Sequence, residues 1–124
     1  MKIILRLFFI SSFYFLILVG NTQSQEVQRH QAVTAYIYNF AKNILWQNED
    51  SIKEFQFIVI SEDKNIIQEM MNLSKAKTLR NKSIKVTSTS SIGDVSKVQL
   101  IYLAKEKENY FVELFDKIEG KKIC

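Results

Sequence analysis

The chain has 124 residues, of which 47% are hydrophobic and 24% charged, and this balance is that of a globular domain rather than of a disordered tail. Seventeen basic residues stand against thirteen acidic ones, so the formal net charge is +4. With one histidine, one cysteine and three separated glycines, the composition excludes a Cys/His zinc cluster, an internal disulfide and a glycine-rich phosphate loop.

The N-terminal segment has the three parts of a secretory signal peptide. Lys2 and Arg6 supply the positive start, and an apolar run over residues 7–19 follows. This run is shorter than the roughly 20 residues of a membrane span, but it has the length of a signal core. The small side chains of Thr22 and Ser24 lie two positions apart, so we predict a signal peptide over residues 1–24.

Removal of this segment leaves one domain over residues 25–124, which we expect to be exported and periplasmic. Cleavage after Gln25 is one alternative. An uncleaved N-terminal anchor in the inner membrane is another, because apolar residues also precede Arg6. Without Lys2 and Arg6, 15 basic residues stand against 13 acidic ones, a net charge of +2. A nearly neutral exported domain is not expected to bind nucleic acid.

The first expected element of the domain is a helix over residues 27–46 that is rich in aromatic side chains. Its apolar positions recur at intervals of three and four, the period of one helix face: Val33, Tyr36, Ile37, Phe40, Ala41 and Ile44. Tyr38 and Asn39 point away from that face, because successive residues turn by about 100°.

Five residues of this helix are candidates for binding a partner: Tyr36, Tyr38, Asn39, Phe40 and Trp46. In this hypothesis Tyr38 lies at the centre of an exposed apolar patch. The alternative is a helix buried on two sides, with Asn39 hydrogen-bonded and Trp46 in the core.

Strand and helix patterns alternate along the rest of the chain. Residues 55–60 form a nearly unbroken apolar run, typical of a strand covered on both faces in a parallel sheet. A helix capped by Ser61 or Asp63 follows, and its buried side is predicted to be Ile66, Ile67, Met70, Met71 and Leu73. In residues 83–88 apolar and polar side chains alternate, as in a strand that lies near a sheet edge with one face in solvent. Residues 98–104 indicate another buried strand.

A last helix is expected to end at Gly120 as its C-cap, and one of its sides is lined by Phe111, Leu114, Phe115 and Ile118. The order of elements predicts an α/β domain, with helices packed on a mostly parallel sheet of three to four strands. Residues 121–124 look like the start of the fourth strand. We therefore expect a fragment that is incomplete at its C-terminus.

No set of residues for catalysis is visible in the sequence. His30 is the only histidine, so a triad or zinc site would need it, and we expect it on the surface near the start of the mature chain. The basic run at residues 75–85 is interpreted as a solvated helix end and loop, with an anion-binding or membrane-surface patch as the alternative. We expect no enzyme activity, no cofactor and no metal.

Four segments, in this order and spacing, resemble the YfiR-like family of exported bacterial proteins: "AYIYNFAKNILW", "FQFIVISED", "LRNKSIKV" and "VQLIYLAKEK". The resemblance covers the chain from about Gln28 onward. This chain has Gln47 where the family typically has proline after the tryptophan. It has Val98 and Gln99 where the family often has a Cys-His pair, which leaves the helix exit and any family disulfide open.

The resemblance implies a non-enzymatic periplasmic regulatory or sensor domain in signal transduction. YfiR-like proteins restrain a membrane-bound diguanylate cyclase in cyclic-di-GMP signalling, and similar domains precede sensor histidine kinases. The implied partner is such a membrane signalling protein, and a homodimer is also consistent. The alternative is a periplasmic small-molecule binding protein, with a cleft at the carboxyl ends of the strands near Ser61 and residues 104–105.

Overall fold

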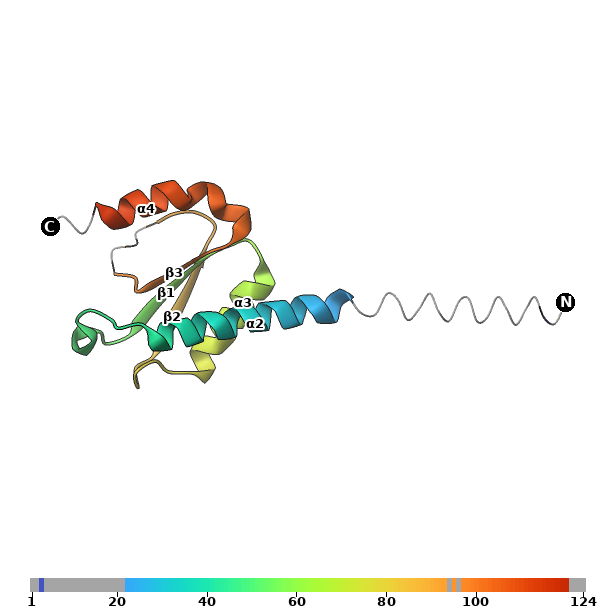
Figure 1. The fold of residues 1–124 in the computed structure, drawn as a ribbon, viewed down its shortest axis with the longest axis horizontal. Helices are drawn as coiled ribbons and strands as arrows, with labels where there is room; N and C mark the ends of the chain where they lie inside the picture. The colour runs from blue at the N-terminus through green and yellow to red at the C-terminus, as the bar shows by residue number, and fades with distance from the viewer. Residues whose placement is uncertain (1–2, 4–21, 94, 96, 121–124) are drawn as a thin grey trace.

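The structure, a computed structural model, describes residues 3, 22–93, 95 and 97–120. Along these residues the elements follow in the order α2 (Thr22–Asn43), η1 (Glu49–Ser51), β1 (Phe55–Ile60), α3 (Lys64–Ala76), β2 (Ile84–Thr89), β3 (Leu100–Leu103), η2 (Lys105–Tyr110) and α4 (Phe111–Glu119) (Figure 1). The predicted apolar signal core and the predicted fourth strand lie outside the described residues.

The three strands form one parallel sheet in the order β2-β1-β3. In this register Phe55 of β1 pairs with Ile84 of β2, and Phe57 of β1 pairs with Leu100 of β3. The central position of β1 explains its apolar run, because it pairs with a strand on each side and buries Phe55, Phe57 and Val59 completely on one face. The predicted α/β class with a parallel sheet is confirmed, and β2 lies at an edge of the sheet as expected.

One face of the sheet is covered by α2 and α3. The buried residues of this layer come from both helices and from the sheet: Ile37, Ala41, Phe55, Phe57, Val59, Met70, Leu79 and Ile84. Phe55 and Phe57 are completely buried. Burial of one such ring stabilises the fold by about 1.5–3 kcal/mol, so this layer is the principal core.

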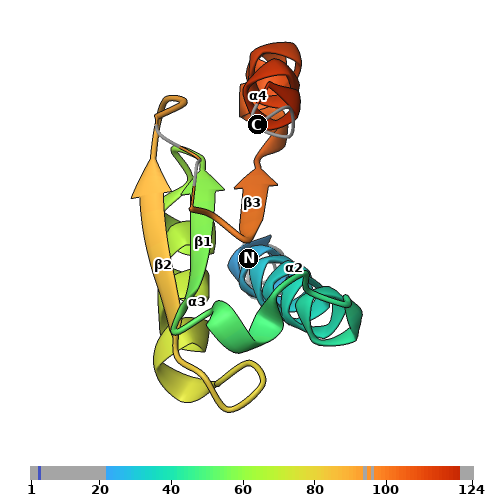
Figure 2. The same ribbon diagram turned by 90° about the vertical axis from the view of Figure 1, so that its left-hand side faces the viewer.

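The other face is only partly covered, and its buried cluster is small. Val95, between β2 and β3, and Leu114 of α4 are buried against Ile60 of β1. The apolar side of α4 is largely exposed: exposure is 61% for Phe111, 48% for Phe115 and 39% for Ile118. The reason is that α4 lies beyond the carboxyl ends of the strands, so it meets the sheet mainly through Leu114 (Figure 2).

The helix α2 ends at Asn43, so the prediction that it reaches Trp46 is wrong. The chain turns back after the helix, and Trp46 Nε1 donates to the carbonyl of Ala41 at 3.1 Å. The indole packs edge-on against Phe55, with ring centroids 5.5 Å apart and an interplanar angle of 60°. The indole therefore satisfies one of the carbonyls that a helix end leaves without an intrahelical partner.

Candidate functional site

The helix α2 turns a different side toward the core from the one that the sequence predicted. Thr34, Ile37 and Ala41 are buried, at intervals of three and four residues. Tyr36 and Phe40, which were expected on the buried face, are 74% and 56% exposed. This face of α2 is buried where the helix lies beside α3.

Tyr38 is not at the centre of an exposed patch. Its ring packs against the principal core, and its hydroxyl donates to the carbonyl of Thr78 at 2.9 Å, just beyond α3. Trp46, which the alternative interpretation placed in the core, is half-buried against it, and Asn39 is exposed, with its backbone carbonyl accepting from Asn43 Nδ2 at 2.7 Å. Tyr38 and Trp46 therefore hold α2 to the domain.

Tyr36 and Phe40 remain as an exposed aromatic pair, which we name the α2 patch. They lie four residues apart and hence on the same side of the helix. Leu45, just beyond the helix, is 91% exposed. Neighbouring exposed apolar side chains are a feature of protein interaction sites, whereas a single exposed one is ordinary.

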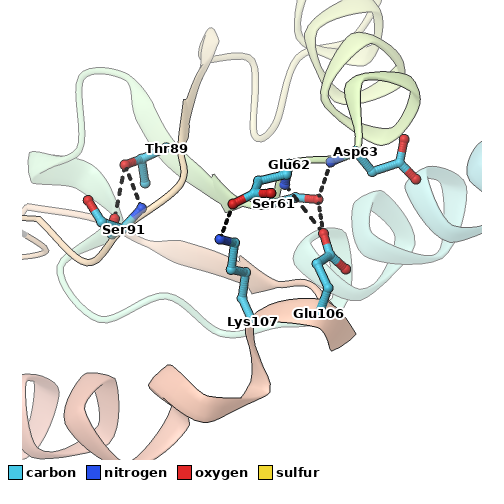
Figure 3. Close-up of polar contacts among 7 residues, drawn as sticks. All are labelled: Ser61, Glu62, Asp63, Thr89, Ser91, Glu106 and Lys107. Carbon is cyan, nitrogen blue, oxygen red and sulfur yellow. Dashed lines mark hydrogen bonds and ion pairs between the residues drawn. The ribbon is translucent and has the colours of Figure 1, made fainter.

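A second group of side chains gathers where β1 and β3 end, and Figure 3 shows its contacts. Ser61, which is only 3% exposed, donates to Glu106 Oε1 at 2.6 Å and accepts from the backbone N–H of Asp63 at 3.0 Å. The backbone N–H of Glu62 also points to Glu106 Oε1, at 3.3 Å, and Lys107 forms an ion pair with Glu62. These contacts join the β1–α3 turn to η2.

The carboxylate of Glu106 is stabilised in its ionised form by these donors. The Ser61 hydroxyl is the largest cause, and together with backbone N–H groups it holds the pKa of Glu106 below its usual value of 4.5. Burial of the neighbouring Tyr102 raises the pKa of its hydroxyl above 10.0, and the Glu106 charge adds to this rise. Tyr102 therefore keeps its proton at neutral pH and can donate a hydrogen bond.

Asp63 caps α3 and also contacts α2. One oxygen accepts from the backbone N–H of Asn65 at 2.9 Å, and the other lies 2.8 Å from His30 Nε2. The prediction that His30 is a plain surface residue is wrong, since its side chain is 13% exposed. The reason is that α2 begins at Thr22, which places His30 four residues before Thr34 on the buried stripe.

A cavity of about 190 Å³ lies between the N-terminal half of α2 and the ends of β1 and β3. Arg29 and His30 line it from α2, Ser61 and Asp63 from the β1–α3 turn, and Tyr102 from β3. This is the place that the sequence indicated for a ligand cleft. A larger and more open hollow of about 470 Å³ lies on the other face of the sheet, beside β1 and β2.

The polar side chains around Ser61 do not form a nucleophile paired with a general base. The hydroxyl of Ser61 is buried and donates to Glu106, whereas His30 contacts Asp63. A catalytic serine requires its base within hydrogen-bond reach and an accessible oxygen. Within residues 3, 22–93, 95 and 97–120, no group of three or more His, Cys, Asp or Glu side chains could hold a metal ion.

The comparisons with known proteins give one match. A family model described as YfiR/HmsC-like covers residues 30–124, a range that includes the α2 patch and the turn at Ser61. No curated protein and no solved structure matches the chain. In the part of the chain that the structure describes, every helix is too short or too polar to span a membrane.

Proposed function

Because this chain belongs to the YfiR/HmsC-like family, a family of periplasmic regulatory domains linked to cyclic-di-GMP signalling, we propose that it regulates a membrane-bound signalling protein by direct contact. The partner would be a diguanylate cyclase or a histidine kinase module. Export through a signal peptide at residues 1–24 would place the domain in the periplasm beside that partner. In this role the chain is a binding protein and not an enzyme.

The mechanism that fits such a domain is differential binding to two states of the partner. A regulator shifts a two-state equilibrium only as far as its affinities for the two states differ. Couplings of this kind are typically about 1–3 kcal/mol, which corresponds to a change of roughly 5- to 150-fold in the partner's equilibrium. One exposed surface that fits one state better than the other is sufficient.

The observation that supports this proposal is the exposure of the α2 patch on a well-anchored helix. Tyr36 and Phe40 project from α2, while Ile37 and Ala41 on its other side are buried in the principal core. Aromatic residues are enriched among the residues that dominate protein interfaces. A rigid helix also presents them without the entropic cost of ordering a loop.

The experiment compares two matched surface variants of the full chain. We expect Tyr36→Asp combined with Phe40→Asp to weaken binding to the periplasmic part of the partner by at least tenfold, which is about 1.4 kcal/mol. The control is Val112→Asp on α4, which is 68% exposed and lies outside the α2 patch. Binding is measured by titration calorimetry, and circular dichroism shows that both variants remain folded.

Cellular cyclic-di-GMP provides the second readout if the partner is a cyclase. The double variant should release the cyclase and raise cyclic-di-GMP, while Val112→Asp should leave it unchanged. Equal affinity of the folded double variant and the wild type would contradict the role of the α2 patch.

A further inference from the structure

The cavity beside Ser61 lies at a topological switch point of the sheet. The adjacent parallel strands β1 and β3 are followed by helices on opposite faces. After β1 the chain enters α3, whose Met70 belongs to the principal core, and after β3 it enters η2 and α4, whose Leu114 packs on the other face. Open α/β sheets bind ligands in the crevice that such a divergence opens at the carboxyl ends of the strands.

Three segments of the chain form the walls of the cavity. The two loops that diverge at the switch point form two walls, and the N-terminal half of α2 forms the third. Its volume of about 190 Å³ is below the 300–1,000 Å³ of pockets for drug-sized ligands, so it suits a molecule of a few heavy atoms.

Several polar groups of the lining already have partners within the protein. Asp63 is engaged by His30 and by the backbone N–H of Asn65. Glu106 is engaged by the hydroxyl of Ser61. The carboxylates of Asp63 and Glu106 therefore hold the segments that form the cavity walls in place.

The two cationic side chains of the lining differ from these carboxylates in their contacts. Arg29 and Lys105 line the cavity, and neither forms a hydrogen bond or ion pair with any residue that the structure describes. The hydroxyl of Tyr102 lacks a hydrogen-bond partner there as well. Glu26, one turn before Arg29 on α2, is the one lining carboxylate without such a contact.

We propose that this cavity binds a small organic carboxylate, held by the guanidinium of Arg29 and the ammonium of Lys105, with the Tyr102 hydroxyl as a further donor. A guanidinium matches a carboxylate with two parallel hydrogen bonds. Three lining carboxylates, Glu26, Asp63 and Glu106, oppose every anion at this site, and they oppose a doubly charged phosphate more strongly than a singly charged carboxylate. Glu26 is placed to accept from an ammonium group if the carboxylate belongs to an amino acid.

This inference goes beyond the proposed function and does not rest on it, because binding is measured with the chain alone. The probes are acetate, L-alanine and inorganic phosphate at constant ionic strength, and amide chemical shifts are followed by NMR. We expect saturable shifts with acetate or L-alanine around the cavity. Arg29→Gln should weaken that binding by at least tenfold, while Lys53→Gln, an exposed lysine outside the cavity, should not.

The variant Glu26→Gln distinguishes two kinds of ligand, an amino acid and a simple carboxylate. If the ligand is an amino acid, this variant weakens binding of L-alanine and leaves binding of acetate unchanged. If it is a simple carboxylate, acetate binds at least as well as L-alanine. Saturable binding of phosphate alone, no saturable binding of any probe, or unchanged affinity in a folded Arg29→Gln variant would overturn the inference.

Discussion

His30 Nε2 lies 2.8 Å from Asp63 Oδ2, so one polar contact joins the N-terminal half of α2 to the residue that caps α3. The other oxygen of Asp63 accepts from the backbone N–H of Asn65, the bond that an N-cap residue makes. Asp63 thus fixes the start of one helix and the position of another.

The first prediction concerns the loss of stability in acid. Burial raises the pKa of Asp63, but hydrogen bonds from Asn65 and His30 and the attraction of His30 outweigh it, so the pKa lies below the usual 3.8. A depressed folded-state pKa gives stability that is present above the unfolded value and is lost as the pH falls through the folded value. The stabilisation from Asp63 should therefore disappear below about pH 4.

The variant Asp63→Asn tests this, because asparagine can still cap the helix but carries no charge. The free energy of unfolding is measured in urea with the fluorescence of Trp46, the only tryptophan. We expect the difference between wild type and Asp63→Asn to shrink as the pH is lowered from about 5 to about 3. A difference that stays constant over this range would mean that the charge of Asp63 contributes nothing.

The second prediction concerns the buried hydroxyl of Ser61. In Ser61→Ala the carboxylate of Glu106 loses its main donor, so its pKa should rise toward 4.5 in an NMR titration. The backbone N–H of Asp63 also loses its acceptor, and we expect the free energy of unfolding to fall by about 1–3 kcal/mol.

The matched control for that variant is Ser83→Ala. Ser83 also donates to a carboxylate, Glu54 Oε2 at 2.9 Å, but this hydrogen bond is exposed. Its loss should change the free energy of unfolding by less than about 0.5 kcal/mol. Equal losses in the two variants would show that burial of Ser61 is energetically unimportant.

The third prediction is a stabilising substitution on α2. Thr34 is 4% exposed, and its hydroxyl has no hydrogen-bond partner among the described residues. Valine has nearly the same shape without the hydroxyl, so Thr34→Val should raise the free energy of unfolding by about 1 kcal/mol. Thr34→Ser, which keeps the hydroxyl and loses the methyl group, should lower it. Chemical denaturation followed by circular dichroism measures both, and a loss of stability in Thr34→Val would contradict the interpretation.

The fourth prediction concerns the return of the chain after α2. Trp46→Phe keeps an aromatic ring beside Phe55 but removes the hydrogen bond to Ala41, and we expect a loss of about 1 kcal/mol. Trp46→Ala also removes the ring and should cost about 2–4 kcal/mol. Circular dichroism is the readout, because these variants lack tryptophan. Leu45→Ala, at a 91% exposed position, is the control and should be nearly neutral.

The periodicity of apolar residues along the sequence was sufficient to predict the sheet and the helix α3. The apolar run at residues 55–60 coincides with β1, and Asp63, one of two predicted caps, is the N-cap of α3. Such elements are predictable because their burial follows from local alternation and capping chemistry. The parallel order followed from the helix between the first two strands.

The orientation of α2 was not predictable from hydrophobicity alone. Tyr36 and Phe40 complete an apolar face in the sequence, but the buried face is the one with Thr34, Ile37 and Ala41, and a hydrophobicity pattern does not rank small residues above aromatic ones. The polar contacts at Ser61 were also missed, because they join segments about 45 residues apart, and local patterns do not report such pairs. His30 could have been found by continuing the stripe from Ala41 and Thr34 toward the N-terminus.

The helix α2 carries Arg29 and His30 at the cavity and Phe40 at the exposed patch. Phe40 lies eleven positions after Arg29, so with a rise of 1.5 Å per residue the two sites are about 17 Å apart along the helix axis. A ligand in the cavity would therefore affect the aromatic pair only by moving α2 as one body, against the packing of Ile37 and Ala41 in the principal core.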